Sequence, residues 1–225
     1  MTGGSGGGSG GGSTGRSTGG LAGGLAKRLF DLLAAGAGVV LLAPLLLGIA
    51  LWVGLDSRGP VLFRQVRVGR YGVPFTIYKF RTMADRSDGR RRDAGPQLTV
   101  GQDPRVTRAG RFLRRYKLDE LPQLFNVLEG SMSLVGPRPE VPRYVECYPP
   151  AVRNTVLSVA PGVTDLAAIL YKDESAILGQ ARDPERAYVE TILPVKLEYY
   201  QRYVRERSFW LDLRIIFQTL AAIVR

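Results

Sequence analysis

The sequence predicts a mostly helical α/β protein, a membrane-associated single domain with a re-entrant N-terminal helix and a short β-hairpin. First, residues 32–55 form a long apolar run without a charged residue. Second, residues 60–81 are rich in Val, Phe, Ile and Tyr around a Gly-Arg-Tyr-Gly turn. Third, later segments place apolar residues at helical spacing, and the last of them is amphipathic. Long apolar runs indicate membrane contact, and the spacing patterns separate strands from helices.

Composition narrows the chemistry. The 225 residues carry 31 Lys and Arg against 20 Asp and Glu, a formal net charge of +11. This balance suits nucleic acid, an anionic membrane surface or phosphorylated substrates. The chain has no histidine, which excludes histidine-based triads and general bases. Cys147 is the only cysteine, so an intrachain disulfide is excluded and a reducing compartment is expected. A lone cysteine without histidine is more typical of structure than of catalysis.

The N-terminal part divides into a tail and a membrane helix. Residues 1–24 are almost entirely Gly, Ser and Thr, and we expect a disordered tail because they cannot bury enough apolar surface. Residues 25–58 are expected to form the membrane helix. As one straight helix, the apolar run would reach about 36 Å and cross a hydrocarbon core of about 30 Å. A helix that spans the membrane once is therefore the default alternative.

Two features favour a re-entrant helix instead. Pro44, preceded by Ala43, should kink the run because it removes a backbone hydrogen bond. Basic residues flank both ends, which places both ends in the cytoplasm and the protein at the inner (cytoplasmic) membrane. These flanking residues are Lys27, Arg28, Arg58, Arg64, Arg67 and Arg70. A buried core helix is the soluble alternative, but the length of the run and Trp52 near its end disfavour it.

Residues 59–225 are expected to form the domain on the cytoplasmic face. Two extended runs, residues 60–68 and 74–81, predict the β-hairpin. Lys79 and Arg81 in the second run are either exposed strand residues or phosphate contacts. Residues 84–102 are polar and charged, which predicts a mobile surface loop that could close over substrate.

Helices are expected after that loop. Asp183-Pro184 has the chemistry of a helix start, and Pro194 should interrupt or restart the helix. The stretch Ser208–Arg225 is amphipathic. It is either a helix that packs into the core or one that lies in the membrane interface.

A carboxylate pair surrounded by cations occupies the centre of the chain. Asp119 and Glu120 stand between basic residues upstream and the rigid Pro137-Arg138-Pro139 downstream. Cations can neutralise phosphate oxygens, while a carboxylate can attack phosphorus or hold a metal. The upstream cations are Arg105, Arg108, Arg111, Arg114, Arg115 and Lys117. Alternatively, Asp119 only caps the helix that follows, and the arginines form a solvated face; capping and catalysis are compatible.

The central block resembles the signature of the bacterial sugar transferase family, the monotopic phosphoglycosyl transferases, in the form that consists of the catalytic domain alone. The similarity covers about residues 27–225. The matching stretches are Leu118–Leu128, Gly130–Pro139, Gln65-x-Arg67-x-Gly69, Tyr78–Met83 and Pro161–Thr164. After Thr164 the chain departs from the family pattern, with Asp165 in place of Gly and Lys172 where an Arg is usual.

The resemblance implies transfer of a sugar-1-phosphate from a UDP-sugar to polyprenol (undecaprenyl) phosphate, the start of glycan assembly such as exopolysaccharide. Asp119 would attack the β-phosphorus, release UMP and carry the phosphosugar. Glu120 would orient Asp119 or assist proton transfer, and Mg²⁺ on Asp119 would bridge to the phosphates. The implied phosphate contacts are Arg114, Arg138, Lys79, Arg81, Arg67 and Lys172. The family's re-entrant helix breaks at a Ser-Pro or similar pair, here Ala43-Pro44.

Other classes of function stay open at this point. A non-catalytic basic protein could bind an anionic membrane surface or nucleic acid, although the apolar run argues against nucleic acid as a partner. A third possibility keeps the fold but transfers the phosphosugar in one step, with the carboxylates only holding metal. The identity of the sugar is not determined, and neither is the oligomeric state, for which a homodimer is one alternative.

Overall fold

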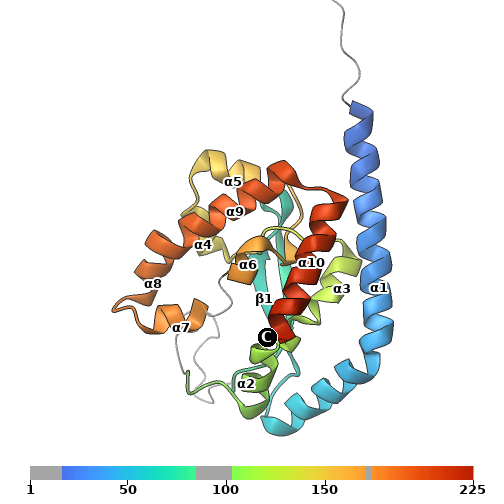
Figure 1. Ribbon diagram of the computed structural model, residues 1–225. Coiled ribbons are helices and arrows are strands. Elements are labelled where there is room, and N and C mark those ends of the chain that lie inside the picture. Colours follow the sequence, from blue (N-terminus) through green and yellow to red (C-terminus); the bar gives the residue numbers. More distant parts are fainter. Residues whose placement is uncertain (1–16, 85–102, 171–173, 225) are drawn as a thin grey trace, which may run out of the picture.

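The computed structural model describes residues 17–84, 103–170 and 174–224. Within these ranges the protein is mostly helical, as predicted, and it has two small two-stranded sheets (Figure 1). The predicted loop at 84–102, apart from Ala84, and Lys172 lie outside the described residues. The first half comprises α1 Ser17–Asp56, β1 Leu62–Val68, η1 Arg70–Gly72, β2 Pro74–Phe80, α2 Arg108–Arg115, η3 Leu118–Glu120, α3 Gln123–Glu129 and β3 Ser133–Val135. The second half comprises α4 Pro142–Glu146, α5 Pro150–Val156, β4 Gly162–Thr164, α6 Leu166–Leu170, α7 Glu174–Gly179, α8 Pro184–Ala187, η4 Tyr188–Ile192, α9 Leu193–Glu206 and α10 Phe209–Val224.

Helix α1 is the longest element. It begins at Ser17, N-terminal to the expected start at residue 25. The helix continues through Pro44, and Figure 1 shows it running down one side of the domain and then bending beneath it. The segment Gly24–Asp56 is long and apolar enough to cross a membrane. Only 17% of the most apolar 18-residue stretch of this segment is buried against the rest of the protein.

Helix α1 has two arms, one before and one after its bend, and both contact the same domain (Figure 1). In the first arm, Arg28 donates from Nη1 to the carbonyl of Val127 at 2.6 Å and from Nη2 to that of Leu128 at 3.1 Å. Asp31 on the same arm accepts hydrogen bonds from the Ser133 hydroxyl at 2.8 Å and from the Leu134 N–H at 3.3 Å. The first arm therefore joins α3 to β3.

The second arm of α1 packs on α2 and the end of the hairpin. Ile49 and Val53 share an apolar cluster with Phe80 and Leu113. At the end of the helix, the Asp56 carboxylate accepts the Ala109 N–H at 3.0 Å. Polar contacts on both sides of the apolar run therefore reach one folded unit.

The predicted hairpin is confirmed. Strands β1 and β2 pair antiparallel, with Leu62 opposite Phe80 and Val68 opposite Pro74. The turn contains Tyr71, a non-glycine residue with a positive φ of 58°. The second sheet is a short parallel pair of β3 and β4. Its backbones meet at Gly136 and Gly162, where a Cβ on Gly162 would lie 2.1 Å from the Gly136 nitrogen. The close approach therefore requires glycine.

The C-terminal helices form the largest core. Their cluster includes Tyr144, Tyr188 and Leu197 from α4, η4 and α9. Asp183 caps α8 as predicted, accepting the N–H groups of Glu185 at 3.1 Å and Arg186 at 3.0 Å. A π-helical turn, η4, precedes α9, whose first turn contains Pro194, so the proline restarts the helix.

Helix α10 has two different faces. Ile215 is fully buried against Val135 and Tyr203, while Trp210 and Phe217 are 77% and 67% exposed. The helix thus packs into the core with one face and leaves an aromatic face uncovered within the described chain. The sequence had left these two roles as alternatives, and each face fits one of them.

Candidate active site

The carboxylate pair lies in η3, a 3₁₀ turn between α2 and α3. Leu118 and Leu121 flank the pair and pack against the cluster that joins α1 to α2. The turn is thus held by its apolar residues, and its acidic residues are free for other contacts. Helix α3 has Pro122 at its N-cap, without a side-chain capping bond. The simple interpretation of Asp119 as a helix cap is therefore wrong.

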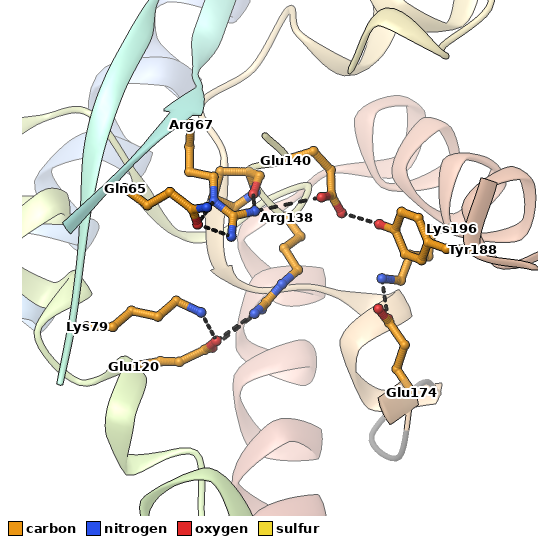
Figure 2. A network of polar contacts seen from close by, with 10 residues as sticks. Gln65, Arg67, Lys79, Glu120, Arg138, Glu140, Glu174, Tyr188 and Lys196 are labelled. Carbon is orange, nitrogen blue, oxygen red and sulfur yellow. Dashed lines mark hydrogen bonds and ion pairs between the residues drawn. The ribbon is translucent and has the colours of Figure 1, made fainter. Parts of the chain in front are cut away.

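Glu120 is held by two cations from distant segments (Figure 2). Lys79 Nζ, from β2, lies 2.6 Å from Glu120 Oε1. Arg138, beyond β3, lies 2.5 Å away through Nη2 and donates a longer bond of 3.4 Å from Nη1 to Oε2. Burial would raise the pKa of Glu120, but Arg138 and Lys79 hold it well below its usual range. Glu120 is therefore a fixed anion.

Asp119 lies in different surroundings. It is 8% exposed, and its carboxylate accepts no hydrogen bond from any residue that the structure describes. Burial and the neighbouring Glu120 raise the pKa of Asp119, while Lys79, Arg114 and Lys117 oppose this change. A desolvated carboxylate without hydrogen-bond donors retains its nucleophilicity, so of the two residues Asp119 is the one suited to attack.

A buried network supports Arg138 from behind (Figure 2). Arg67 on β1 donates to the Pro139 carbonyl at 3.0 Å and to Gln65 Oε1 at 2.7 Å. Glu140 accepts the Tyr188 hydroxyl at 2.6 Å and lies 3.7 Å from Arg67 Nη1. These bonds fix the segment that follows Arg138, and Glu120 in turn raises the pKa of Arg138 well above its usual range.

The structure brings together only part of the predicted site. Asp119, Glu120, Lys79 and Arg138 form one cluster, with Arg67 one layer behind it. Arg114 donates from Nε to the Thr82 hydroxyl at 2.8 Å, and its charge also acts on Asp119. Lys172 is outside the described residues.

Arg81 is placed elsewhere. It is buried and donates to the carbonyls of Val53 at 3.1 Å, Ser57 at 2.5 Å and Pro60 at 2.6 Å. Its guanidinium therefore caps the C-terminal end of α1, where a helix exposes unpaired carbonyls. The structure does not bring Arg81 into the phosphate-facing cluster.

Several neighbours of the cluster were missed by the sequence reading. Glu140, Tyr188 and Lys196 belong to the buried network, and Asp165 is an electrostatic partner of Arg138. Asp165 is fully buried, and its Oδ2 has no hydrogen-bond partner in the structure. The departure of Asp165 from the family pattern was a signal in the sequence that this residue lies near the site. No local motif marks Glu140, Tyr188 or Lys196.

The domain thus has a helix long and apolar enough to cross a membrane and a carboxylate held by two cations beside a second buried carboxylate, an arrangement whose charges suit phosphorylated substrates. Residues 22–225 match the family described as bacterial sugar transferase. The chain belongs to this family, as its motifs predicted.

Curated relatives extend the comparison. The chain is 38% identical over 200 residues to UDP-N-acetylgalactosamine-undecaprenyl-phosphate N-acetylgalactosaminephosphotransferase of Aeromonas hydrophila, covering 88% of this chain and 43% of the relative. It is 41% identical over 196 residues to UDP-glucose:undecaprenyl-phosphate glucose-1-phosphate transferase of Klebsiella pneumoniae, covering 86% and 39%. It is 38% identical over 204 residues to the exopolysaccharide production protein PSS of Rhizobium leguminosarum, covering 87% and 94%. The chain thus spans less than half the length of the first two relatives.

Proposed function

We propose that this chain transfers a sugar-1-phosphate from a UDP-sugar to undecaprenyl phosphate at the cytoplasmic face of the inner membrane. The proposal rests on one observation above all: no described residue donates a hydrogen bond to the carboxylate of buried Asp119, which stands beside Glu120, a carboxylate that two cations hold in place. The names of the relatives support the donor and acceptor classes. Those names differ in the sugar, so the sugar stays open.

The proposed chemistry has two displacement steps. An Asp119 carboxylate oxygen attacks the β-phosphorus, the bond from that phosphorus to the bridging oxygen breaks, and UMP leaves with that oxygen. A phosphate oxygen of the lipid then attacks the same phosphorus, and the bond to Asp119 breaks. The carboxylate is regenerated, and the product is a polyprenyl diphosphate sugar. Neither step needs a histidine, because positioning and charge neutralisation dominate phosphoryl transfer.

Glu120 has a positioning role in this proposal. Its low pKa keeps it ionised, which favours holding Lys79 and Arg138 over assisting proton transfer. Arg138 and Lys79 then lie beside the attacking carboxylate, where charge develops on the phosphate oxygens. Arg138 can meet phosphate through two N–H groups, which lysine cannot.

The residues fit Mg²⁺ held jointly by protein and substrate. Within the parts of the chain that the structure covers, no group of three or more His, Cys, Asp or Glu side chains could enclose a metal. Mg²⁺ commonly takes one or two carboxylates and completes its shell with phosphates and water. Asp119 provides such a carboxylate. When bound, the ion would supply neutralisation of the diphosphate charge.

The membrane topology in this proposal is re-entrant. The contacts of Arg28 and Asp31, before the apolar run of α1, and of Asp56, after it, reach the same domain. A helix that crossed the bilayer would separate its two ends by the membrane thickness. The bend of α1 and its exposed apolar middle favour entry and exit through one leaflet.

The test is UMP release in detergent with Mg²⁺, over a panel of UDP-sugars, with and without undecaprenyl phosphate. We expect acceptor-dependent turnover of one donor and a stoichiometric UMP burst without acceptor. Asp119→Asn should lower kcat by about a thousandfold or more, since the attacking group is lost. Glu129→Gln, an exposed carboxylate on α3, is the matched control and should behave as wild type.

Other outcomes distinguish the alternatives. Turnover without a burst would favour single-step transfer. If folded, membrane-bound protein releases no UMP from any UDP-sugar, with or without undecaprenyl phosphate, the enzymatic proposal is contradicted. Binding to an anionic membrane would then be the remaining function.

A further inference from the structure

Lys117, two residues before Asp119, has an unusual backbone. Its φ of 54° and ψ of 21° lie in the left-handed region, and among the described non-glycine residues only Tyr71 shares a positive φ. Lys117 follows the C-cap of α2, a place where glycine is the usual residue because it adopts this conformation without strain. The conformation lets the chain turn from α2 into the carboxylate turn. A lysine here is therefore unfavourable for the backbone and calls for another reason.

The side chain of Lys117 is also distinct among the cations around the pair. Lys79 and Arg138 are bound to Glu120. Lys117 is half-buried, and no hydrogen bond or ion pair of its ammonium occurs among the residues that the structure describes. Lys117 is the N-cap residue of η3, so its side chain begins two residues from Asp119, at the start of the turn that carries both carboxylates. The site thus has an uncommitted cation beside the nucleophile.

From this arrangement we infer that Lys117 is a phosphate-contacting residue, whose ammonium binds the diphosphate of the nucleotide-sugar donor. The inference rests on the proposed function and adds a residue that the family motifs did not single out. Attack by Asp119 transfers negative charge to the departing nucleotide phosphate, and a cation at the start of the same turn can neutralise it. The left-handed backbone keeps Lys117 and Asp119 within one short turn.

Substitution separates charge from backbone strain. Lys117→Gly removes both, so we expect an unfolding midpoint equal to or above wild type, together with kcat/KM for the UDP-sugar reduced about ten- to hundredfold. Lys117→Asn tolerates the same backbone without the charge and should match it. Lys117→Arg keeps the charge and should retain most of the activity. Tyr71→Gly relieves the same strain far along the chain and should leave the kinetics unchanged.

Two readouts locate the contact. The KM for the UDP-sugar and the KM for undecaprenyl phosphate are measured separately, and UDP binding is followed by calorimetry on the same variants. A rise in donor KM with weaker UDP binding supports the inference. Wild-type kinetics in both Lys117→Gly and Lys117→Asn would overturn it. A rise confined to the acceptor KM would also overturn it, by assigning Lys117 to the lipid phosphate. If wild type turns over no UDP-sugar, the proposed function fails, while unchanged or weakened UDP binding in Lys117→Gly still decides the contact.

Discussion

Asp119 and Glu120 are adjacent in the chain, yet their carboxylates have opposite electrostatic properties. Glu120 binds two cations, and its pKa is held well below the usual range. Burial and the charge of Glu120 raise the pKa of Asp119. The difference arises from which residues reach each carboxylate, since both lie in the same turn. This division of one acidic pair into a fixed anion and a bare nucleophile is the residue-scale basis of the proposed reaction.

Asp165 provides a prediction on pH and stability. Burial raises its pKa from 3.8 to about 6, although Arg138, the Ala168 N–H and Lys196 oppose this change. The buried Tyr200 hydroxyl, which also has no partner, is another polar group that interacts with it. Since the folded protein holds this proton more tightly than the unfolded chain, stability falls as pH rises from about 4 to about 6.

Asp165→Asn should remove that loss. At pH 7 we expect the variant to be more stable than wild type by up to about 3 kcal/mol, the free energy that corresponds to this pKa change. The gap should close below about pH 4, where Asp165 is protonated in both states. Unfolding monitored by fluorescence from pH 4 to pH 7 checks this, with Glu129→Gln as an exposed control. A gap that does not vary with pH would contradict the prediction.

At the scale of elements, α1 holds several segments of the domain together. Its first arm holds α3 through Arg28 and β3 through Asp31. These are the elements that follow the carboxylates and precede Arg138. Its second arm meets α2, while Arg81 ties its last turn to the end of β2. Helix α1 therefore joins the segments that carry the proposed catalytic side chains.

The contact of α2 with Thr82, just after β2, allows a test by substitution. A Cβ on Gly110 would lie 2.1 Å from the Thr82 carbonyl oxygen, so Gly110→Ala must displace α2. We expect a loss of about 1–3 kcal/mol of stability from this overpacking, and lower activity because Thr82 holds Arg114. Gly36→Ala is the control: nothing lies within 4 Å of its Cβ, and alanine favours the helix. Equal unfolding midpoints for both variants would refute the expectation.

At the scale of the whole molecule, the uncovered apolar surface belongs to α1 and α10. Leu41 and Leu47 on α1 are 78% and 72% exposed. Trp210 and Phe217 on α10 are also largely exposed. Surfaces of this size on the described chain need lipid or another partner. In the proposed topology, lipid covers the bend of α1 while both of its ends stay in the cytoplasm.

Single-cysteine reporters test this topology in a Cys147→Ala background. Gly24→Cys and Arg58→Cys flank the apolar segment Gly24–Asp56 of α1 and are both exposed, whereas Leu47→Cys marks its apolar middle. In oriented membrane vesicles, a water-soluble thiol reagent should label both end reporters from the same side and leave the middle one unlabelled until detergent is added. Labelling of the ends from opposite sides would show a spanning helix. Labelling of all three without detergent would show that lipid does not cover α1.

Local patterns determined much of this protein. Periodicity and backbone chemistry operate over a few residues. They predict the long apolar helix, the hairpin and the restart of the helix at Pro194. The motif around Asp119 predicted the family, and the absence of histidine narrowed the chemistry that we propose.

The tertiary structure alone decided which cation meets which carboxylate. Lys79 and Arg138 lie 41 and 18 residues from Glu120, and no local pattern encodes such distances. Arg81 would share a strand face with Lys79 by alternation, but β2 ends at Phe80, and the arginine turns to the carbonyls of α1 instead. Sequence specifies residue type and period, whereas the electrostatic environment of a buried group depends on the packing of segments distant in the chain.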